Sequence, residues 1–417
     1  MKKLFTSALL LGGLCLANLA SAADRTVGPG GTYGSIGDAI AAAADGDRIL
    51  VKPKAVPYGE TLNITKSLTI LSADEGTYFD CVGTWTYTPA TAGKKLTIIG
   101  LRLLSGDIQN GGSAPGGARA RLELLNSVIK GDLNFHAPQY DLTVAADSIF
   151  GHVHFAFGKV IGNYIDGFAE GEVIYVTTDP VTTTDSVWVV GNKVRGNNTN
   201  SHSVLNLSTS SQYIYCVNNF LLLNYANVNN YGVYFNAQRA GVGVNTFANN
   251  SIYDAGNQNW CCSRYALYIN SPLTNTQIVA NLISSAANGN GAAALVQSGG
   301  VNNYTLAYNF LRGFTMSVSV PNNGTNKTNS TATINATTGQ ATGDAINGGP
   351  TDAEYTDINL SRGDVGAWGG SFTLENFHPF VSTTALNNRG GRVFLLRAPR
   401  RVLQGGSIQV KAEGFDR

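Results

Sequence analysis

Charged residues are scarce in this 417-residue chain: only 13% of them are Asp, Glu, Lys or Arg, and the formal net charge is +1. Globular proteins typically carry about 25% charged residues. The near-zero net charge provides no general attraction to nucleic acid, so we expect no nucleic-acid partner. Carboxylates are rarest in one part, because Asp254 is the only acidic residue from Ser186 to Gly343. An acid–base site would therefore have to draw on residues from roughly 100 to 185.

Long apolar runs are also missing after the first 22 residues, so we expect no membrane-spanning helix, which needs about 20 apolar residues. Residues 1–22 have the pattern of a secretory signal peptide. Lys2 and Lys3 supply the positive end, residues 9–19 are mostly apolar, and Ala20-Ser21-Ala22 fits a cleavage site. We therefore expect an exported protein that is periplasmic, extracellular or held at the cell surface.

Cysteine is limited to four residues after the expected leader: Cys81, Cys216, Cys261 and Cys262. Export permits disulfide bonds. Four cysteines allow three complete pairings, and the sequence does not select among them. Cys216 lies in a strand-like run and is equally compatible with a small buried apolar residue. The adjacent pair at 261–262 lacks the spacing of a zinc-binding motif.

A repeat of short segments accounts for most of the chain, which holds 49 glycines and many Asn, Ser and Thr residues. Each segment has apolar residues, an Asn or Asp, one variable residue and another apolar residue. The repeated polar positions are Asn126, Asp147, Asn163, Asn192, Asn219, Asn250, Asn281 and Asn309. A second set of amides precedes the last four of them at near-constant separation: Asn206, Asn236, Asn270 and Gln297. These segments lack a 3.6-residue apolar period and are typical of short strands.

The repeat predicts an all-β fold, a right-handed parallel β-helix (solenoid) over residues 23–388. One coil cannot bury its inner face alone, whereas coils stacked about 4.8 Å apart form a continuous core. The recurring Asn residues are expected to stack as a structural ladder, since Asn also tolerates the left-handed turn conformation. The open N-terminal end needs a cover. We assign this cap to residues 32–51, a short Ala-rich helix followed by a strand.

Two segments fall outside the repeat. Residues 317–350 are low in complexity and are expected to form a long surface loop. The basic C-terminal tail, residues 389–417, contains the alternating stretch 407–411, which is typical of an exposed strand. Three roles remain open for this tail: it covers the C-terminal end of the β-helix, it docks on a protein partner, or it begins a further domain.

The entry and the end of the repeat resemble the pectin-lyase-like superfamily of right-handed parallel β-helix proteins. The similar stretches are 35–70, with Asp45-Gly46-Asp47, and "DINLSRGDVGAWGG" at 357–370. The resemblance covers about residues 25–380, with three extra residues, "KAV", at 54–56. It implies the fold. It does not imply one activity, because the group contains lyases, hydrolases, esterases, adhesins and uncharacterised surface proteins.

One group of side chains suits catalysis. "GDLNFHA" at 131–137 and "GHVHFAF" at 151–157 align as adjacent coils. Asp132 and Asn134 are then expected to point outward beside His152 and His154. These side chains could supply a general base or bind a metal, or could form only a solvated hydrogen-bonded ladder. Three nearby carboxylates are near enough in sequence to join them: Asp166, Glu170 and Glu172.

A second group suits sugar binding, which uses aromatic rings beside amides and hydroxyls. Tyr234 and Tyr268 hold equivalent positions just before Asn236 and Asn270, and Trp260 lies between them in sequence. If the tyrosines point outward, they form a pair beside amides, and the alternative is packing beneath a loop. The nearest match to a lyase base is Lys193 with Arg195, which could equally be a solvated pair.

Two hypotheses about function follow. The first is an exported scaffold that binds a polysaccharide or cell-surface component without catalysis, as an adhesin or matrix component does, with Asn134, Tyr234, Tyr268 and Trp260 as binding residues. The second is a polysaccharide lyase or glycoside hydrolase acting from a face built by residues 130–172, with Asp132, His152 and His154 as catalytic candidates. Ca²⁺ is expected only under the lyase hypothesis, since lyases of this fold class use carboxylates around Ca²⁺.

Overall fold

The computed structural model shows a right-handed parallel β-helix that is nearly all β. The described residues are 22–112, 115–137, 139–167, 171–177, 186–196, 203–210, 212–224, 230–237, 239, 243–255, 264–270, 275–285, 293–298, 304–316, 324–377, 392–397 and 410–415.

Three parallel sheets of 12, 11 and 11 strands form the walls of the solenoid in the part that the structure describes. The chain passes through sheet 1, sheet 2 and sheet 3 in turn, and each circuit is one coil. Sheet 1 consists of β1 Asp24–Val27, β2 Arg48–Val51, β5 Leu68–Ser72, β8 Lys95–Ile99, β11 Ala120–Leu125, β14 Tyr140–Ala145, β17 Gly158–Ile161, β20 Ser186–Val190, β23 Tyr213–Val217, β26 Asn245–Ala248, β29 Thr276–Val279 and β32 Tyr304–Ala307.

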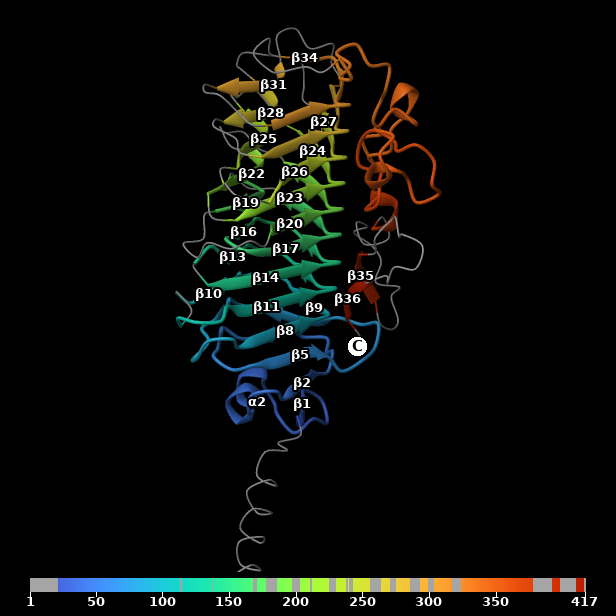
Figure 1. Ribbon diagram of the computed structural model, residues 1–417. Coiled ribbons are helices and arrows are strands. Elements are labelled where there is room, and N and C mark those ends of the chain that lie inside the picture. Colours follow the sequence, from blue (N-terminus) through green and yellow to red (C-terminus); the bar gives the residue numbers. More distant parts are fainter. Residues whose placement is uncertain are drawn as a thin grey trace, which may run out of the picture.

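The other two sheets have the same coil-to-coil order (Figure 1). Sheet 2 consists of β3 Tyr58–Gly59, β6 Phe79–Val82, β9 Leu101–Leu103, β12 Val128–Ile129, β15 Ser148–Ile149, β18 Tyr164–Gly167, β21 Lys193–Gly196, β24 Phe220–Leu223, β27 Ser251–Asp254, β30 Leu282–Ser285 and β33 Phe310–Arg312. Sheet 3 consists of β4 Leu62–Ile64, β7 Trp85–Tyr87, β10 Ile108–Asn110, β13 Leu133–Phe135, β16 Val153–Phe155, β19 Ile174–Val176, β22 Ser203–Thr209, β25 Asn230–Ala237, β28 Arg264–Asn270, β31 Ala293–Ser298 and β34 Thr315–Met316.

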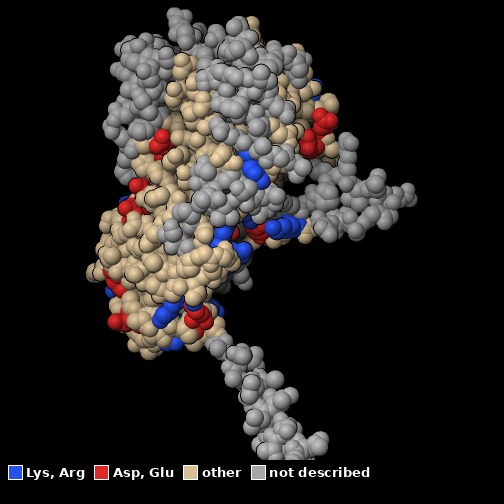
Figure 2. All heavy atoms as spheres, turned by 60° about the vertical axis from the view of Figure 1, so that its left-hand side comes forward, with Lys and Arg blue, Asp and Glu red and all other residues tan. Residues whose placement is uncertain are grey.

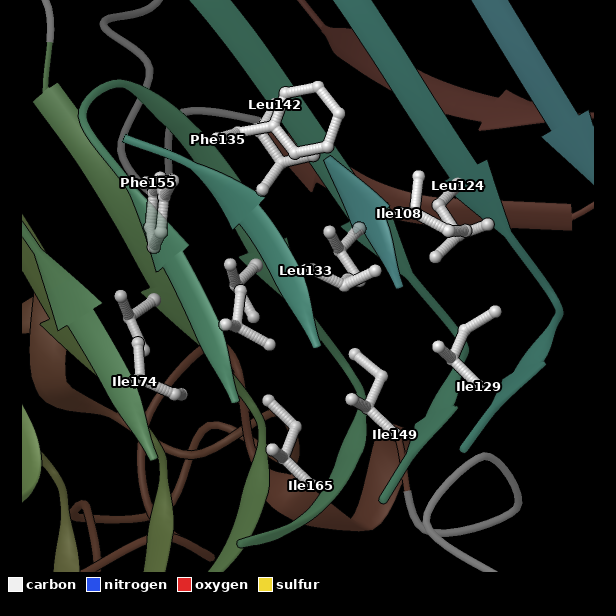
Figure 3. Packing of buried hydrophobic residues seen from close by; sticks show 14 of the residues in the cluster. Ile108, Leu124, Ile129, Leu133, Phe135, Leu142, Ile149, Phe155, Ile165 and Ile174 are labelled. Atoms are coloured by element: carbon white, nitrogen blue, oxygen red, sulfur yellow. The ribbon is translucent and has the colours of Figure 1, made fainter. Parts of the chain in front are cut away.

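The core is a set of apolar columns inside the solenoid (Figure 3). In sheet 2, Ile149 pairs with Ile129 on one side and with Ile165 on the other. In sheet 3, Phe135 pairs with Phe155, and both are almost fully buried. Burial of each such side chain contributes about 1.5–3 kcal/mol. Because strand side chains alternate, the residues between these columns point outward and are free to build a surface.

The N-terminal end carries the helix α2, Ile36–Ala42, whose two ends are held by charged side chains of later coils. Ser35 caps the helix by accepting a hydrogen bond from the main-chain N–H of Asp38 at 3.0 Å. The Glu60 carboxylate accepts from the N–H groups of the first turn at 2.8 and 2.7 Å, where a negative charge favours the helix dipole. Lys66 Nζ donates to three carbonyls at the other end. The helix packs on β1 and β2, as a cap of the first coil would.

A ladder of asparagine side chains runs through the turn between sheets 1 and 2. In each step one amide Nδ2 donates to the Oδ1 of the next coil and to a main-chain carbonyl of the preceding coil, as Asn219 does with Asn250 Oδ1 at 3.0 Å and Val189 O at 2.8 Å. Each Oδ1 also accepts the N–H of the preceding asparagine. Residues in this continuous ladder are Asn163, Asn192, Asn219, Asn250, Asn281, Asn309 and Asn326.

The prediction for Asn126 requires a correction, because this residue is not in the ladder column. Ser127 holds the column position: its N–H donates to Asp147 Oδ1 at 2.6 Å and its hydroxyl accepts from the N–H of Leu101. Asn126 lies one residue earlier at φ 49°, the left-handed position that Gly162 and Gly191 occupy in later coils. Asparagine suits both positions, so the residue type alone did not separate them.

The segment after the last coil returns along the outside of the solenoid (Figure 1). It contains three short 3₁₀ helices, η1 Gly343–Ala345, η2 Ala353–Tyr355 and η3 Leu374–Asn376. The described part of the low-complexity segment is not a free surface loop, because Ala332 and Ile334 are buried against Phe220 and Phe310. We call residues 324–377 the return segment.

The return segment also covers an apolar seam on the outer surface of sheet 1. The seam consists of Leu71, Ile99, Leu125, Ala145, Ile161, Val190, Val217, Ala248, Val279 and Ala307. Phe377 packs on this seam, close to the backbone of Gly162 and Gly191. A Cβ atom at Gly191 would lie 2.2 Å from the Phe377 ring, so this contact requires glycine as well as the positive φ of 64°.

The C-terminal tail forms an antiparallel pair of strands, β35 Arg392–Arg397 and β36 Lys411–Phe415, beside the N-terminal half of the solenoid (Figure 1). Lys159 on sheet 1 forms an ion pair with Glu413 on β36. A cleft of about 450 Å³ separates β36 from sheet 1. The described tail therefore does not cover the C-terminal end of the β-helix, which corrects that alternative. The reason is that the return segment carries the chain back toward the earlier coils.

Candidate functional site

The outer surface of sheet 3 holds most of the side chains singled out from the sequence. Strand register stacks them one coil above another: Asn134, His154, Tyr175, Asn206, Tyr234 and Tyr268. We call this set the outer column. Each member is partly exposed, and its strand neighbours on both sides are buried in the core. The alternation of the strands therefore positions the column on the surface.

Asp132, His152 and His154 come together near the start of β13 and β16. Asp132 Oδ1 accepts from the main-chain N–H of His152 at 2.8 Å and lies 3.0 Å from His152 Nδ1. The two imidazole rings are 5.8 Å apart, and His154 packs edge-on against Tyr175 at 5.6 Å. The alignment of 131–137 with 151–157 thus agrees with the observed register, in which Asn134 pairs with His154.

The predicted outward direction of His152 agrees with its contacts to Asp132 and His154, but the side chain is covered and the residue is only 6% exposed. Gly171 lies over its ring: a Cβ atom there would be 3.4 Å from His152 Nε2. The Asp132 side chain remains 37% exposed. A substrate would therefore reach Asp132 and His154, but not His152, from the outside.

The charges of this cluster follow from its contacts. Burial acts to raise the pKa of Asp132, but hydrogen bonds from His152 outweigh it and lower the pKa. Burial lowers the pKa of His154, although a hydrogen bond from its Nε2 to Glu172 O at 3.1 Å acts in the opposite direction. Near neutral pH this leaves an ionised carboxylate beside a neutral imidazole, the states that a general base requires. In the described residues no group of three His, Cys, Asp or Glu side chains is arranged to hold a metal ion.

Four tyrosines gather at the other end of the outer column. Tyr234 and Tyr268 stack at 5.7 Å with 16° between their planes, and Tyr231 and Tyr265 stack at 5.6 Å with 14°. The two pairs touch, since Tyr231 lies 4.6 Å from Tyr268. Asn270 Nδ2 donates to the Tyr234 hydroxyl at 2.8 Å. We call these four residues the tyrosine cluster.

Tyr231 and Tyr265 were not expected beside Tyr234 and Tyr268, because each lies three residues earlier in its strand and a regular strand would place it on the opposite face. The strand pairing is interrupted at Gly232 and Ala266: Tyr231 pairs with Tyr265 and Val233 with Leu267, but the two residues between them are not paired. Gly232 approaches its neighbour so closely that a Cβ atom would lie 2.5 Å from Ala266 O. This interruption places two successive residues in the core and both tyrosines outside. The repeated pattern of "YGVYFN" and "YALYIN" was the available signal.

Uncharged polar groups surround the tyrosine cluster. Asn236 Nδ2 donates to Ser208 Oγ at 3.3 Å on the neighbouring strand. In the described residues 174–176, 203–209, 231–237 and 265–270 of sheet 3, no side chain carries a formal charge. Figure 2 shows scattered charged side chains on a surface that is mostly uncharged where it is described. Burial and the neighbouring tyrosines raise the pKa of Tyr231 and Tyr234, so both hydroxyls stay neutral.

Other candidates do not join these groups. Asp166 lies on sheet 2, where it forms an ion pair with Arg195 at 3.5 Å. Lys193 Nζ donates to Thr337 O of the return segment at 2.6 Å, on the sheet 2 side of the solenoid. Cys81 and Cys216 are buried free thiols. Trp260, Glu170, Cys261 and Cys262 lie outside the described residues.

Comparisons with known proteins found no relative. No family model matches the chain, and the searches of curated proteins and of solved structures also return no match. The assignment of the fold therefore rests on the strand topology alone. In the described part of the chain, no helix has the length and apolar character needed to span a membrane.

Proposed function

We propose that this protein is an exported β-helix scaffold that binds a carbohydrate through the tyrosine cluster, without catalysis. The observation that supports it is two stacked tyrosine pairs, each formed between the neighbouring strands β25 and β28, beside amides and hydroxyls on the uncharged stretches 203–209, 231–237 and 265–270. Tyrosine combines an apolar ring with a polar tip, so it can contact both the C–H groups and the hydroxyls of a sugar.

The superfamily and the location belong to the same proposal. Stretches 35–70 and 357–370 and the parallel solenoid favour a distant member of the pectin-lyase-like superfamily. The N-terminal 22 residues favour export, which would place the tyrosine cluster in contact with cell-surface or matrix polysaccharides. The tail strands β35 and β36 offer a further surface for a protein partner, although they lie on sheet 1 and not on the carbohydrate-binding face.

We expect Tyr234→Ala to weaken binding of the responding glycan about tenfold, because it removes one stacked ring and the partner of Asn270. The glycan is first identified by a glycan-array screen of the full chain and then measured by calorimetry. Tyr234→Phe keeps the ring and should retain most of the affinity. Tyr78→Ala removes a partly exposed tyrosine from an early coil and serves as the control. Equal affinity in all three variants would contradict the proposal.

The alternative function is a polysaccharide lyase or glycoside hydrolase, favoured by the contact of Asp132 with His152 beside His154. If it is correct, the full chain will release new reducing ends or unsaturated uronates from some polysaccharide. Asp132→Ala and His154→Ala should then each reduce the rate at least about a hundredfold, as loss of a general base does. Activity that survives both substitutions would remove this cluster from consideration, and a response to added Ca²⁺ would favour a lyase.

A further inference from the structure

A groove of about 450 Å³ lies in the return segment, away from sheet 3. Its walls include one aromatic side chain, two carboxylates and three amides: Trp368, Asp357, Asp364, Gln340, Asn359 and Asn376. The three amides are exposed, so their hydrogen-bonding groups are accessible from the groove mouth. Neither hypothesis about function used this groove, because the sequence showed the region only as a low-complexity loop followed by the end of the repeat.

Trp368 is fixed in the groove wall. Its Nε1–H donates to Thr338 O at 3.1 Å, and its ring packs against the cluster that contains Phe220 and Phe310. Two apolar side chains continue the wall, since Ile346 is 44% exposed and Ile358 is 55% exposed. A ligand with an apolar face would therefore find a rigid contact surface in the groove, and such surfaces commonly mark binding sites.

The two carboxylates line the groove, and neither forms an ion pair with a side chain that the structure describes. Asp357 Oδ1 accepts from the N–H of Gly370 at 2.8 Å and from that of Asp364 at 3.2 Å, and its Oδ2 accepts from Ser361 Oγ at 3.3 Å. The hydrogen bonds among the described residues use only Oδ1 of Asp364, which accepts from Asn347 N–H at 2.7 Å. Burial raises the pKa of Asp364, and the negative charge of Asp357 raises it further. A cation bound in the groove would relieve this repulsion.

The nearest basic side chains are directed elsewhere. Arg362 Nε donates to Gly349 O at 2.6 Å, and its guanidinium lies 6.0 Å from the ring of Tyr308. Lys327 is paired with Asp344 at 3.1 Å. The groove-lining residues that the structure describes include neither lysine nor arginine. The groove thus combines negative charge, an aromatic wall and several amides in one concave site.

We propose that this groove binds an amino sugar residue of a polysaccharide, with its ammonium group between Asp357 and Asp364. The Trp368 ring would contact the C–H face of the sugar, and Gln340, Asn359 and Asn376 would bind its hydroxyls. A lysine side chain offers the ammonium group but no hydroxyls for the amides, so the amides favour the sugar. This site is separate from the tyrosine cluster, and it does not depend on binding there.

The test is calorimetric titration of the full chain with glucosamine oligomers, at a pH at which their amines are protonated. The same titration is repeated with N-acetylated oligomers of equal length and with a lysine-rich peptide. The proposal expects binding of the glucosamine oligomer, binding at least about tenfold weaker for the acetylated form, and no comparable binding of the peptide. Equal binding of the acetylated oligomer, or stronger binding of the peptide, would overturn it.

Matched variants locate the site. Asp364→Asn keeps the acceptor for Asn347 N–H but removes the charge, so it should weaken glucosamine binding about tenfold. Asp352→Asn removes an exposed carboxylate of the same segment outside the groove and should change nothing. Tyr234→Ala should also leave this affinity unchanged. Loss of glucosamine binding in Tyr234→Ala, with Asp364→Asn unaffected, would assign the ligand to the tyrosine cluster and reject the groove while supporting the proposed function.

Discussion

Replacing Asn250 by leucine is expected to destabilise the solenoid by about 4 kcal/mol. The side chain is fully buried and makes four ladder hydrogen bonds: Nδ2 donates to Cys216 O and Asn281 Oδ1, and Oδ1 accepts from the main-chain and side-chain nitrogens of Asn219. Leucine has a similar shape but no polar atoms. It leaves the Asn219 N–H and the Cys216 carbonyl buried without these partners, and each such loss costs about 1–3 kcal/mol.

The measurement is the denaturant midpoint of the variant, together with hydrogen exchange of the amides of β23 and β26. Exchange is needed because a stack of repeats can open locally without unfolding as a whole. Gln277→Leu is the matched control, since it removes a partly exposed amide from the outer face of the next coil and should change the stability by less than about 0.5 kcal/mol. If Asn250→Leu behaved like this control, the ladder would not stabilise the fold.

Replacing Asp147 by asparagine is expected to stabilise the protein by about 2 kcal/mol at neutral pH. Asp147 holds the ladder position next to Asn163 and is fully buried. Its Oδ1 accepts from Ser127 N–H at 2.6 Å, but in the described structure its Oδ2 has no hydrogen-bond partner. In the other coils the corresponding atom is an amide nitrogen that donates twice, as in Asn163. Asparagine would supply the missing donor, and an unmade buried hydrogen bond costs about 1–3 kcal/mol.

The contribution of Asp147 to stability is expected to fall as the pH rises. Burial raises the pKa of Asp147 well above its usual range, although hydrogen bonds from the backbone of Ser127 and Ala145 act in the opposite direction. The unfolded chain releases this proton near pH 3.9, whereas the folded chain keeps it to higher pH. The stability that the protonated acid contributes is therefore fully present below about pH 4 and is lost as the pH rises toward the folded pKa.

The stabilisation by Asp147→Asn should accordingly be larger at pH 7 than at pH 4. The measurement is the denaturant midpoint of the parent protein and of the Asp147→Asn variant, each at pH 4 and at pH 7. Asp74→Asn, at an exposed position in an early coil, should shift neither midpoint appreciably. A variant that is less stable than the parent at pH 7 would show that the carboxylic acid of Asp147 has a partner that asparagine cannot replace.

The ladder shows how far repeats in the sequence define a fold. An Asn or Asp between apolar residues, recurring once per coil, was enough to predict stacked parallel strands. It did not locate the column to the residue in the early coils, because asparagine also suits the left-handed position that Asn126 occupies at φ 49°. Asn326 was missed for a different reason: it lies in a segment of low complexity, where neighbouring asparagines and threonines obscure the period.

The candidate site was predicted in part for similar reasons. The equivalent repeat positions of Tyr234 and Tyr268 and the alignment of Asn134 with His154 agree with the observed register, whereas the outward direction of the two tyrosines had been left open. Tyr231 and Tyr265 were not expected beside them, because the interrupted pairing at Gly232 and Ala266 breaks the two-residue alternation. His152 was expected to be exposed, but Gly171 lies over its ring and leaves it buried. Local patterns thus predicted the side chains within regular strands and failed where the backbone departs from them.

The sequence by itself determined the architecture, because a stack of coils depends on contacts between adjacent repeats and each repeat carries its own apolar, turn and asparagine positions. Only the tertiary structure decided where the chain goes after the last coil. The return segment packs on the apolar seam of sheet 1 and forms the groove beside Trp368, and the tail strand β36 places Glu413 beside Lys159. These contacts join residues far apart in the chain and follow no period. They depend on which surfaces remain apolar after the coils have stacked.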